Sequence, residues 1–327
     1  MQSWAEIFSG FKSLKILIVG DVMLDSYVWG VVNRISPEAP IPIVNVQKRD
    51  FRLGGAANVA LNIHSLGATP ILCALLGNDI SGNQLLELLQ ERNLSKEGIV
   101  ISKNRKTTTK TRIISGHQHI VRVDDETDII CDEEEEEHLL RKIEKLLPTC
   151  DAIVFEDYDK GVISQNLIEK TVTQALDLNI PTIVDPKKRN FHFYKRVTLF
   201  KPNLKELREG LKIDIEASDN ETIVSAINSL KHKLQIEGVL LTLSEHGIYL
   251  DYKHQEIKLP AVDRKIIDVS GAGDSVVSIA TLCVALKLEA NLIALLSNLT
   301  GGIVCKYIGV VPINPDELLK EVTEVGG

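Results

Sequence analysis

The sequence predicts an α/β protein built on one doubly wound, mainly parallel β-sheet. Short, continuous apolar runs recur along the chain from KILIVG at 15–20 onward, and strands buried on both faces of a parallel sheet have this composition. Segments with a helical spacing of apolar residues separate these runs, which is the pattern of successive βα units. The chain has 327 residues, of which 44% are hydrophobic and 25% charged, and this is enough for one large α/β unit.

The expected elements follow one another without a linker or an internal repeat. Towards the C-terminal end, residues 245–260 predict a hairpin and residues 271–306 predict two packed helices. The expected main strands are 15–20, 70–76, 151–155, 180–185, 197–200 and 238–243, and the expected helices are about 55–66, 79–92, 132–147, 164–178, 203–210 and 219–234.

Two regions, 26–53 and 98–124, interrupt this alternation. Both are rich in β-branched residues at alternate positions and lack a helical period, which indicates antiparallel strands outside the main sheet. Because both regions are inserted early in the chain, with a glycine turn and a helix between them, we expect them to pair into one small sheet that projects as a lid. Residues 1–327 are then a single domain with inserted lid strands.

Composition excludes several classes of protein. The chain has 37 Lys and Arg against 45 Asp and Glu, a net charge of −8, so its overall field repels nucleic acid. The 5 cysteines form no CxxC pair, which is typical of reduced thiols in the cytosol. The N-terminus lacks a secretory pattern, and the longest apolar stretch, 276–296, is interrupted by Lys287 and Glu289. We therefore expect a cytoplasmic protein without membrane or nucleic-acid partners.

The sharpest motif is DVSGAGDS at 268–275, directly before an apolar helix. Gly271, Ala272 and Gly273 let backbone N–H groups converge at the helix N-terminus, where unpaired donors and the helix dipole favour an anion. Asp274 cannot bind an anion, but it can take a proton from an attacking hydroxyl. The alternative, that the glycines only form a turn and Asp274 is an ordinary first-turn acid, is equally compatible with this motif by itself.

Two further motifs place polar groups near glycines or strand ends. In FRLGGAAN, Gly54 and Gly55 open a helix with Asn58 one turn in, so that backbone can approach a polyol and the amide can donate and accept. In GDVMLD, Asp21 and Asp25 follow the first strand, where ligands of α/β proteins bind, and such a pair of acids can chelate sugar hydroxyls.

The remaining motifs suit a nucleotide. In KPNLKE, Asn203 and Glu206 lie one helical turn apart, a spacing that can hold hydrated Mg²⁺ beside phosphates. TLSEHG at 242–247 follows a strand with small and hydroxyl residues, which predicts a loop at the nucleotide's edge. A dinucleotide-dependent oxidoreductase would need GxGxxG after the first strand, and a P-loop enzyme would need GxxxxGK[ST]; both patterns are absent from the sequence.

The order of GGAAN, NLKE, TLSEHG and DVSGAGD resembles that of the ribokinase-like, or phosphofructokinase-B type, carbohydrate kinases, over residues 12–323. Within that family, the strings GDVMLDSYVWG, NRISPEAPIPIV, DYDKGV at 157–162 and VDPK at 184–187 are most similar to the branch that acts on heptose 7-phosphate. RISPEAP is the most distinctive of these strings. The alternative is another sugar or nucleoside kinase of the same family, since the whole family shares the phosphate-transfer motifs.

The resemblance implies a ribokinase-like fold and an activity. The reaction would be MgATP-dependent phosphorylation of O1 of D-glycero-β-D-manno-heptose 7-phosphate, and the 1,7-bisphosphate would feed ADP-heptose and lipopolysaccharide core synthesis. Mg²⁺ with ATP is the expected cofactor set, with a monovalent cation as an addition that the motifs leave open. Some relatives carry a fused nucleotidyltransferase domain; because this chain stops at Gly327, we expect a kinase whose second activity resides on another chain.

The resemblance also assigns residues by position. Asp274 corresponds to the catalytic base, and the preceding Gly271, Ala272 and Gly273 to its anion hole. The positions that correspond to sugar contacts are Asp25, Gly54, Gly55 and Asn58. Those that correspond to the Mg-nucleotide motif and the ATP lining are Asn203, Glu206 (through water to the metal), Thr242, Ser244, Gly247 and Asn298.

The lid segment TKTRIISGHQHIVRVD corresponds to the region around the 7-phosphate. Lys110, Arg112 and Arg122 lie at even spacing on one strand face or its neighbour, where they can contact a phosphate. His117 and His119 alternate in the same way, and we expect one of them to face the ligand. A small sheet with an apolar face and free edges is poorly tolerated by water, so we also expect a homodimer that pairs two lids.

Overall fold

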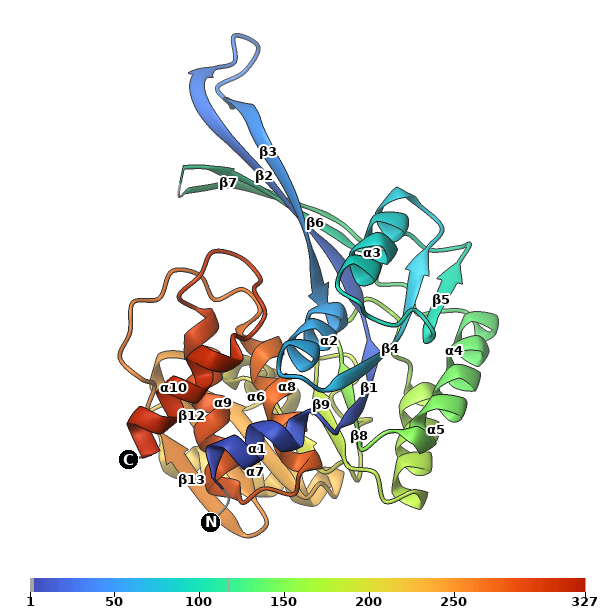
Figure 1. Cartoon of the computed structure of the whole chain (residues 1–327), viewed down its shortest axis with the longest axis vertical. Helices are drawn as coiled ribbons and strands as arrows, with labels where there is room; N and C mark the ends of the chain where they lie inside the picture. Colours follow the sequence, from blue (N-terminus) through green and yellow to red (C-terminus); the bar gives the residue numbers. More distant parts are fainter. Residues whose placement is uncertain (1–2, 117, 327) are drawn as a thin grey trace.

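The computed structural model describes residues 3–116 and 118–326, and its centre is a nine-stranded sheet (Figure 1). The strand order is β13-β12-β11-β10-β9-β8-β1-β4-β5, and the strands from β11 to β5 pair in parallel. This confirms the predicted doubly wound, mainly parallel sheet. Its strands are β1 (Lys15–Gly20), β4 (Thr69–Gly77), β5 (Ile99–Ser102), β8 (Ala152–Glu156), β9 (Thr182–Asp185), β10 (Leu199–Phe200), β11 (Gly238–Thr242), β12 (Ile248–Tyr252) and β13 (Gln255–Leu259).

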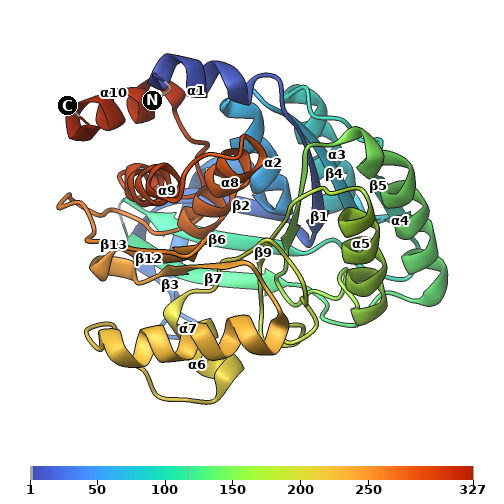
Figure 2. The same ribbon diagram turned by 90° about the horizontal axis from the view of Figure 1, so that it is seen from below.

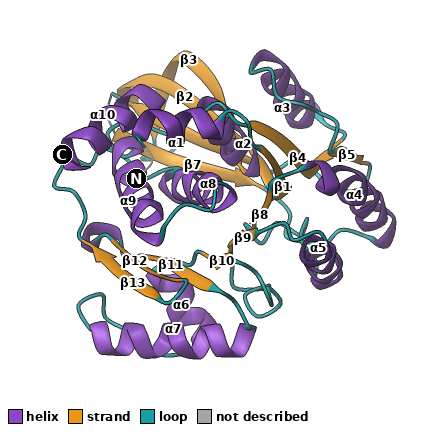
Figure 3. Cartoon of the chain, turned by 60° about the horizontal axis from the view of Figure 1, so that its bottom comes forward, coloured by secondary structure: helices purple, strands orange, loops and turns teal. Residues whose placement is uncertain are grey.

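Helices cover both faces of this sheet (Figure 3). Alternate residues of β1 point to opposite faces, so Ile16 and Ile18 join one core while Leu17 and Val19 join the other. One face carries α1 (Trp4–Phe11), α2 (Ala56–Ser65), α3 (Ile80–Glu91), α8 (Ala272–Ala285), α9 (Ala290–Val304) and α10 (Pro315–Gly326). The other carries α4 (Glu133–Leu146), α5 (Gln165–Asp177), α6 (Leu204–Leu211) and α7 (Asn220–Leu234).

A four-stranded sheet of order β3-β2-β6-β7 forms the lid. Its strands are β2 (Val22–Ile35), β3 (Pro42–Gly55), β6 (Thr109–Ser115) and β7 (Gln118–Asp125), and β2 with β3 projects far beyond the body of the molecule (Figure 1). The predicted lid is confirmed. Seen from below, its strands cross behind the main sheet (Figure 2). His117, which we expected to share a face with His119, lies outside the described residues.

Three boundaries of the lid differ from the sequence-based expectation. Residues 99–102, assigned to the lid, form β5 at the edge of the main sheet, because they continue the apolar parallel pairing of β4. The lid also starts earlier and ends later than expected: β2 begins at Val22 and β3 ends at Gly55. Asp25 therefore lies in a lid strand, not at the end of β1.

The C-terminal expectations hold. The hairpin at 245–260 is β12 and β13, which extends the main sheet in antiparallel pairing, and the two packed helices within 271–306 are α8 and α9. Helix α1 was not anticipated; Ser3 and Glu6 form a reciprocal capping box at its start. Over residues 3–116 and 118–326, no helix has both the length and the apolar character needed to cross a bilayer.

Candidate active site

Charged side chains follow the carboxyl ends of three adjacent parallel strands. Glu156 ends β8, Asp185 ends β9 and Lys201 follows β10, and each is almost fully buried. Lys201 Nζ lies 2.8 Å from Asp185 Oδ2, whereas neither oxygen of Glu156 has a hydrogen-bond partner among the described residues. Burial, together with the neighbouring Asp185, raises the pKa of Glu156 well above its ordinary value. This edge of the sheet thus holds more carboxyl groups than compensating cations.

Asp274 lies beside this cluster in the first turn of α8 and is only 3% exposed. Its Oδ2 accepts a 2.7 Å hydrogen bond from Asn58 Nδ2, and its Oδ1 accepts a 2.7 Å bond from the Tyr158 hydroxyl. Burial raises the pKa of Asp274, although both hydrogen bonds act in the opposite direction. Residues from α2, from the segment after β8 and from α8 therefore meet at one carboxylate.

The three residues before Asp274 form the start of α8. Gly271 adopts φ 79°, a left-handed conformation suited to glycine. The Ala272 N–H donates to Val269 O at 3.2 Å, so this predicted anion donor is used in a turn. A Cβ on Gly273 would lie 3.7 Å from Lys201 Nζ and 3.6 Å from Asp185 Oδ2. The helix N-terminus therefore lies against the Lys201–Asp185 ion pair.

The glycine pair brings the lid's root against α2. A Cβ on Gly54 would lie 2.5 Å from Asp25 Oδ2, and one on Gly55, at φ 58°, would lie 2.4 Å from Asp21 O. Only glycine permits either approach. Asn58, one turn into α2, directs its Nδ2 to Asp274, while its buried Oδ1 has no donor among the described residues. The four residues assigned to sugar contacts thus line one corner next to Asp274.

Asp21 does not belong to this group, which corrects the expectation that it pairs with Asp25. Its two oxygens accept backbone N–H groups of Tyr158 at 2.8 Å, Lys160 at 3.1 Å and Val162 at 3.1 Å. Asp21 therefore anchors the segment after β8. Sequence spacing alone could not separate the two acids, because both follow the same apolar run.

The three lid residues assigned to the 7-phosphate, Lys110, Arg112 and Arg122, are all paired with carboxylates. Arg112 forms an ion pair with the buried Asp25. Lys110 Nζ lies 2.9 Å from Glu126 Oε2 and 3.3 Å from Asp124 Oδ2, and Arg122 Nε lies 2.9 Å from Asp124 Oδ1. Because β6 and β7 pair Arg112 opposite Arg122, the three do share one face, but a phosphate there would have to compete with these carboxylates.

Asn203 and Glu206 form a reciprocal capping box at the start of α6. The Asn203 side chain accepts the Glu206 N–H, and Glu206 Oε2 accepts the Asn203 N–H at 2.8 Å. Glu206 Oε1 also pairs with Lys187 of the VDPK string. Thr242, at the end of β11, forms an isolated parallel β-bridge with Asn203 through the backbone. The Glu206 carboxylate is thus held in place by Asn203 and by the partly buried Lys187.

The other residues assigned to ATP lie around residues 259–261. Gly247, at φ 87°, has no room for a Cβ because Leu259 O would lie 2.0 Å from it. Asn298 of α9 donates to Pro260 O at 2.8 Å. Ser244 begins an exposed turn of 3₁₀ helix over Ser244–His246. Gly247 and Asn298 are therefore brought to one segment, with Ser244 on the turn beside it.

Several residues at this site were not singled out from the sequence: Glu156, Tyr158, Asp185, Lys187 and Lys201. The signal was present, because a charged residue ends or follows each of three apolar runs, and the ends of parallel strands meet at one edge of the sheet. What the sequence did not contain is the path of the segment after β8, which carries Tyr158 to Asp274, 116 residues further along the chain.

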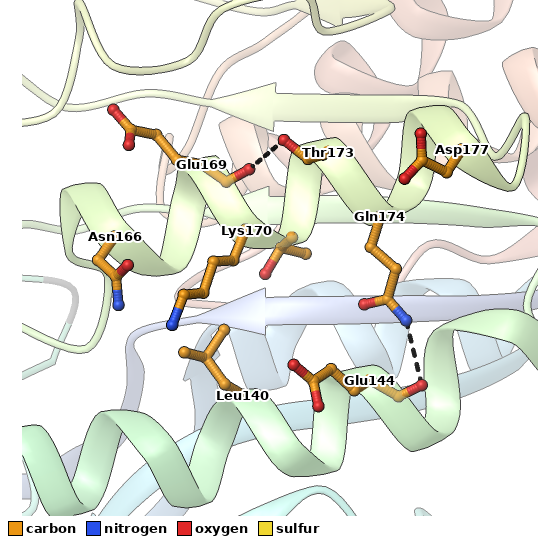
Figure 4. Close-up of a pocket in the computed structure, with 9 residues that line it drawn as sticks. Leu140, Glu144, Asn166, Glu169, Lys170, Thr173, Gln174 and Asp177 are labelled. Carbon is orange, nitrogen blue, oxygen red and sulfur yellow. Dashed lines mark hydrogen bonds between the residues drawn. The ribbon is translucent and has the colours of Figure 1, made fainter.

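A groove on the outer surface lies elsewhere (Figure 4). It runs between α4 and α5, and its lining includes Glu144, Lys170 and Gln174. Gln174 Nε2 crosses it to donate to Glu144 O at 3.2 Å. None of the residues assigned to sugar or nucleotide lines this groove, so it is separate from the cluster around Asp274.

Comparison with known proteins identifies the family of the chain. Residues 13–317 match the model of the pfkB family carbohydrate kinases. The chain is 37% identical to a bifunctional protein HldE of Wolinella succinogenes over 90% of this chain and 61% of that relative. It is 40% identical to the bifunctional protein HldE of Magnetococcus marinus over 95% of this chain and 64% of that relative. The chain thus spans less than two thirds of the length of these curated relatives.

Solved structures share the fold at low identity. Phosphofructokinase-2 from Escherichia coli in complex with potassium superposes with a TM-score of 0.79 at 18% identity, over 96% of this chain and 100% of that one. Arabidopsis thaliana ribokinase complexed with ribose and ATP gives a TM-score of 0.71 at 16% identity, over 94% and 99%. With a ribokinase-like sheet, a lid and a family match over nearly its whole length, the chain belongs to the pfkB family of carbohydrate kinases.

Proposed function

We propose that this chain transfers the γ-phosphoryl group of MgATP to O1 of D-glycero-β-D-manno-heptose 7-phosphate, giving the 1,7-bisphosphate for ADP-heptose and lipopolysaccharide core synthesis. The observation that carries the proposal is the Asp274 carboxylate, buried in the first turn of α8 between a glycine-lined corner and the Lys201 ion pair. The heptose assignment rests on the strings that include RISPEAP. We propose that residues 1–327 act as one kinase domain in the cytoplasm.

Asp274 acts in this mechanism as the proton acceptor. The O1 hydroxyl loses its proton to Asp274 as O1 bonds to the γ-phosphorus, and the bond from that phosphorus to the bridging oxygen of ADP breaks. Negative charge on the transferring group is stabilised at the α8 N-terminus by the N–H groups of Gly271 and Gly273. Lys201, adjacent to Gly273, makes the potential there more positive.

Sugar hydroxyls would bind in the corner formed by Asp25, Gly54, Gly55 and Asn58. The buried Asn58 Oδ1 supports this, because it is an acceptor without a partner among the described residues, and such a group gains free energy when a ligand hydroxyl donates to it. The glycines let the sugar approach the backbone closely. Burial raises the pKa of the Asp25 carboxyl, and the ion pair with Arg112 acts in the opposite direction.

ATP would lie over the segment reached by Gly247 and Asn298, with Thr242 and Ser244 nearby. Both Glu206 oxygens already accept hydrogen bonds, one from Asn203 and one from Lys187, so this carboxylate fits Mg²⁺ through a water molecule, and Mg²⁺ usually keeps several waters. The ion would neutralise phosphate charge when bound with ATP. A monovalent cation is tested by comparing rates in potassium and sodium buffers, since a structural relative binds potassium.

The alternative is another sugar or nucleoside kinase of the family. The observation that favours it is that Lys110, Arg112 and Arg122 are all paired with carboxylates, so that none is free for a distal phosphate. Turnover of ATP with heptose 7-phosphate, unphosphorylated heptose, fructose 6-phosphate, ribose and adenosine separates the two functions. We expect heptose 7-phosphate to be the best substrate; preference for any other member of the panel would overturn the heptose assignment.

Substitution of Lys110 tests the 7-phosphate contact. A charge-assisted contact contributes about 1.5–3 kcal/mol, so Lys110→Ala should reduce the preference for heptose 7-phosphate over unphosphorylated heptose by about one to two decades. Lys106→Ala is the matched control, because Lys106 is exposed and pairs with Asp125 near the lid's root. Arg112→Ala would be harder to interpret, because it also removes the cation that pairs with the buried Asp25. An unchanged ratio in Lys110→Ala would mean that this face does not hold the phosphate.

We further propose that two copies of the chain pair through the lid. Val46, Val121 and Val123 are 43%, 48% and 53% exposed. The strand register places them on the face opposite that of Asp25 and Arg112. A lid therefore has one charged face towards the sugar and one exposed apolar face, which a second copy about a two-fold axis would bury.

Val46→Glu is expected to convert the dimer to a monomer and to raise KM for the sugar while ATP binding stays intact, because a charge on the apolar face cannot be buried without cost. Asn45→Glu is the control, since Asn45 is exposed on the other face of the same strand. Light scattering at micromolar concentration measures the mass. A wild-type mass equal to the chain mass of 36.2 kDa would refute the dimer.

A further inference from the structure

The DYDKGV string at 157–162 has no part in the proposed phosphoryl transfer, yet the fold holds it firmly. Asp21 accepts three of its backbone N–H groups. The buried Asp157 side chain accepts a 2.9 Å bond from Asn190 Nδ2 and a 2.8 Å bond from the Tyr194 hydroxyl. Two buried carboxylates are thus used to fix the path of one short loop, which indicates that the loop positions a functional group.

The side chain that this loop presents is Tyr158. Its hydroxyl donates to Asp274 Oδ1 at 2.7 Å, and the ammonium group of Lys187 lies 5.3 Å from its ring centroid, within the range of a cation–π contact. Lys187 in turn pairs with Glu206 at the start of α6. Tyr158 therefore contacts the proposed base on one side and the nucleotide-side cation on the other.

The other groups around Asp274 show why its hydrogen bond from Tyr158 matters for the carboxylate. Asn58 of α2 donates to Oδ2 only. At the strand ends, the Asp185 and Glu156 carboxyls oppose ionisation of Asp274, whereas Lys201 favours it. Without the Tyr158 hydroxyl, Oδ1 would have no donor and would face a cluster rich in carboxyl groups.

We propose that Tyr158 is a positioning residue, which holds the Asp274 carboxylate in the orientation that receives the sugar proton and separates it from Lys187. The proposal rests on the proposed kinase function. Burial and the neighbouring Asp274 raise the pKa of Tyr158 well above its ordinary value, so the hydroxyl remains a donor throughout the working range of pH. The DYDKGV string then has a defined role, which is to deliver one hydroxyl to the base.

Tyr158→Phe removes that hydroxyl and keeps the ring. We expect kcat to fall about tenfold, the loss of one hydrogen bond to a charged group, while KM for ATP changes little. The acid limb of the kcat–pH profile should move to higher pH, because the hydrogen bond from Tyr158 lowers the pKa of Asp274 and its loss raises that pKa.

Tyr194→Phe is the matched control, since it removes a buried tyrosine hydroxyl that holds the same loop through Asp157 without contacting Asp274. It should lower the melting temperature but leave kcat and the acid limb near wild type. The proposal is overturned if Tyr158→Phe leaves kcat and the acid limb unchanged, or if both variants change them alike. A wild-type chain that phosphorylates no sugar of the panel refutes the kinase function instead, so the two failures are distinguishable.

Discussion

Asp274→Asn is expected to lower kcat by about 10²–10⁴, the usual contribution of a general base, while ATP binding is retained. The amide fills the same space but cannot accept the O1 proton. Its Oδ1 can still accept from Asn58 Nδ2, and its NH₂ group can donate to the Tyr158 oxygen, because a tyrosine hydroxyl accepts as well as donates. The variant therefore loses its base while both neighbours keep a hydrogen bond to the side chain.

Turnover at saturating sugar and calorimetric titration with ATP measure the two effects separately. Asp263→Asn is the control, because Asp263 is an exposed carboxylate shortly before the motif and its loss should leave both quantities unchanged. Turnover of Asp274→Asn within about threefold of wild type would exclude Asp274 as the base, since general-base loss is far costlier. Loss of ATP binding would instead indicate that the charge at this position organises the nucleotide side.

The main sheet was predictable because its strands are buried on both faces, and continuous apolar runs such as 151–155 are typical of such strands. The root of the lid was not. Residues 22–28, VMLDSYV, do not alternate between apolar and polar residues and are all buried, so they do not have the pattern of a surface strand. Only Asp21 separates β1 from β2. Gly20 marks the end of β1, but nothing in the sequence shows that a lid strand starts only two residues later, and the placement of Asp25 depended on that start.

For the site, the sequence predicted that Asp274, Asn58 and the glycines lie near one another, because each is at or near the start of a helix. The hydrogen bond between Asn58 and Asp274 agrees with this prediction. The pairing of Lys110 with Asp124 was missed, since it depends on the exact β6–β7 register. Tyr158 was missed for a different reason: its contact with Asp274 is fixed by Asp21, a residue whose role as a backbone anchor has no local sequence pattern. The spacing of residues within a motif does not indicate hydrogen bonds between a side chain and a backbone segment far away in the sequence.

The largest effect on stability is expected from Lys201. This side chain is 2% exposed and pairs with Asp185 at 2.8 Å, next to Glu156, whose carboxyl has no hydrogen-bond partner in the described part of the chain. Lys201→Met keeps the length of the side chain and removes its charge, which leaves two adjacent buried carboxyl groups without their enclosed cation. Breaking a buried ion pair in this way costs about 3–5 kcal/mol of the free energy of unfolding.

The pH dependence of this loss distinguishes an electrostatic cause from poorer packing. Burial raises the pKa of Glu156 in the folded chain above its unfolded value, so the folded state holds that proton more tightly. The stability from this group is therefore fully present below the unfolded pKa and is lost as the pH rises through the folded pKa. Without Lys201 the carboxyl groups bind protons more tightly still, so the deficit of Lys201→Met should be larger at about pH 8 than at about pH 5.5.

Denaturant unfolding of both proteins at the two pH values measures the deficit, with Lys145→Met as the control. Lys145 pairs with Glu97 at 3.2 Å on the surface, where its side chain is 76% exposed, and exposed pairs contribute little to stability. The control should change little at either pH. A deficit in Lys201→Met that is no larger than in the control, or that does not shrink towards acid pH, would mean that the carboxyl groups at the strand ends are neutralised without Lys201.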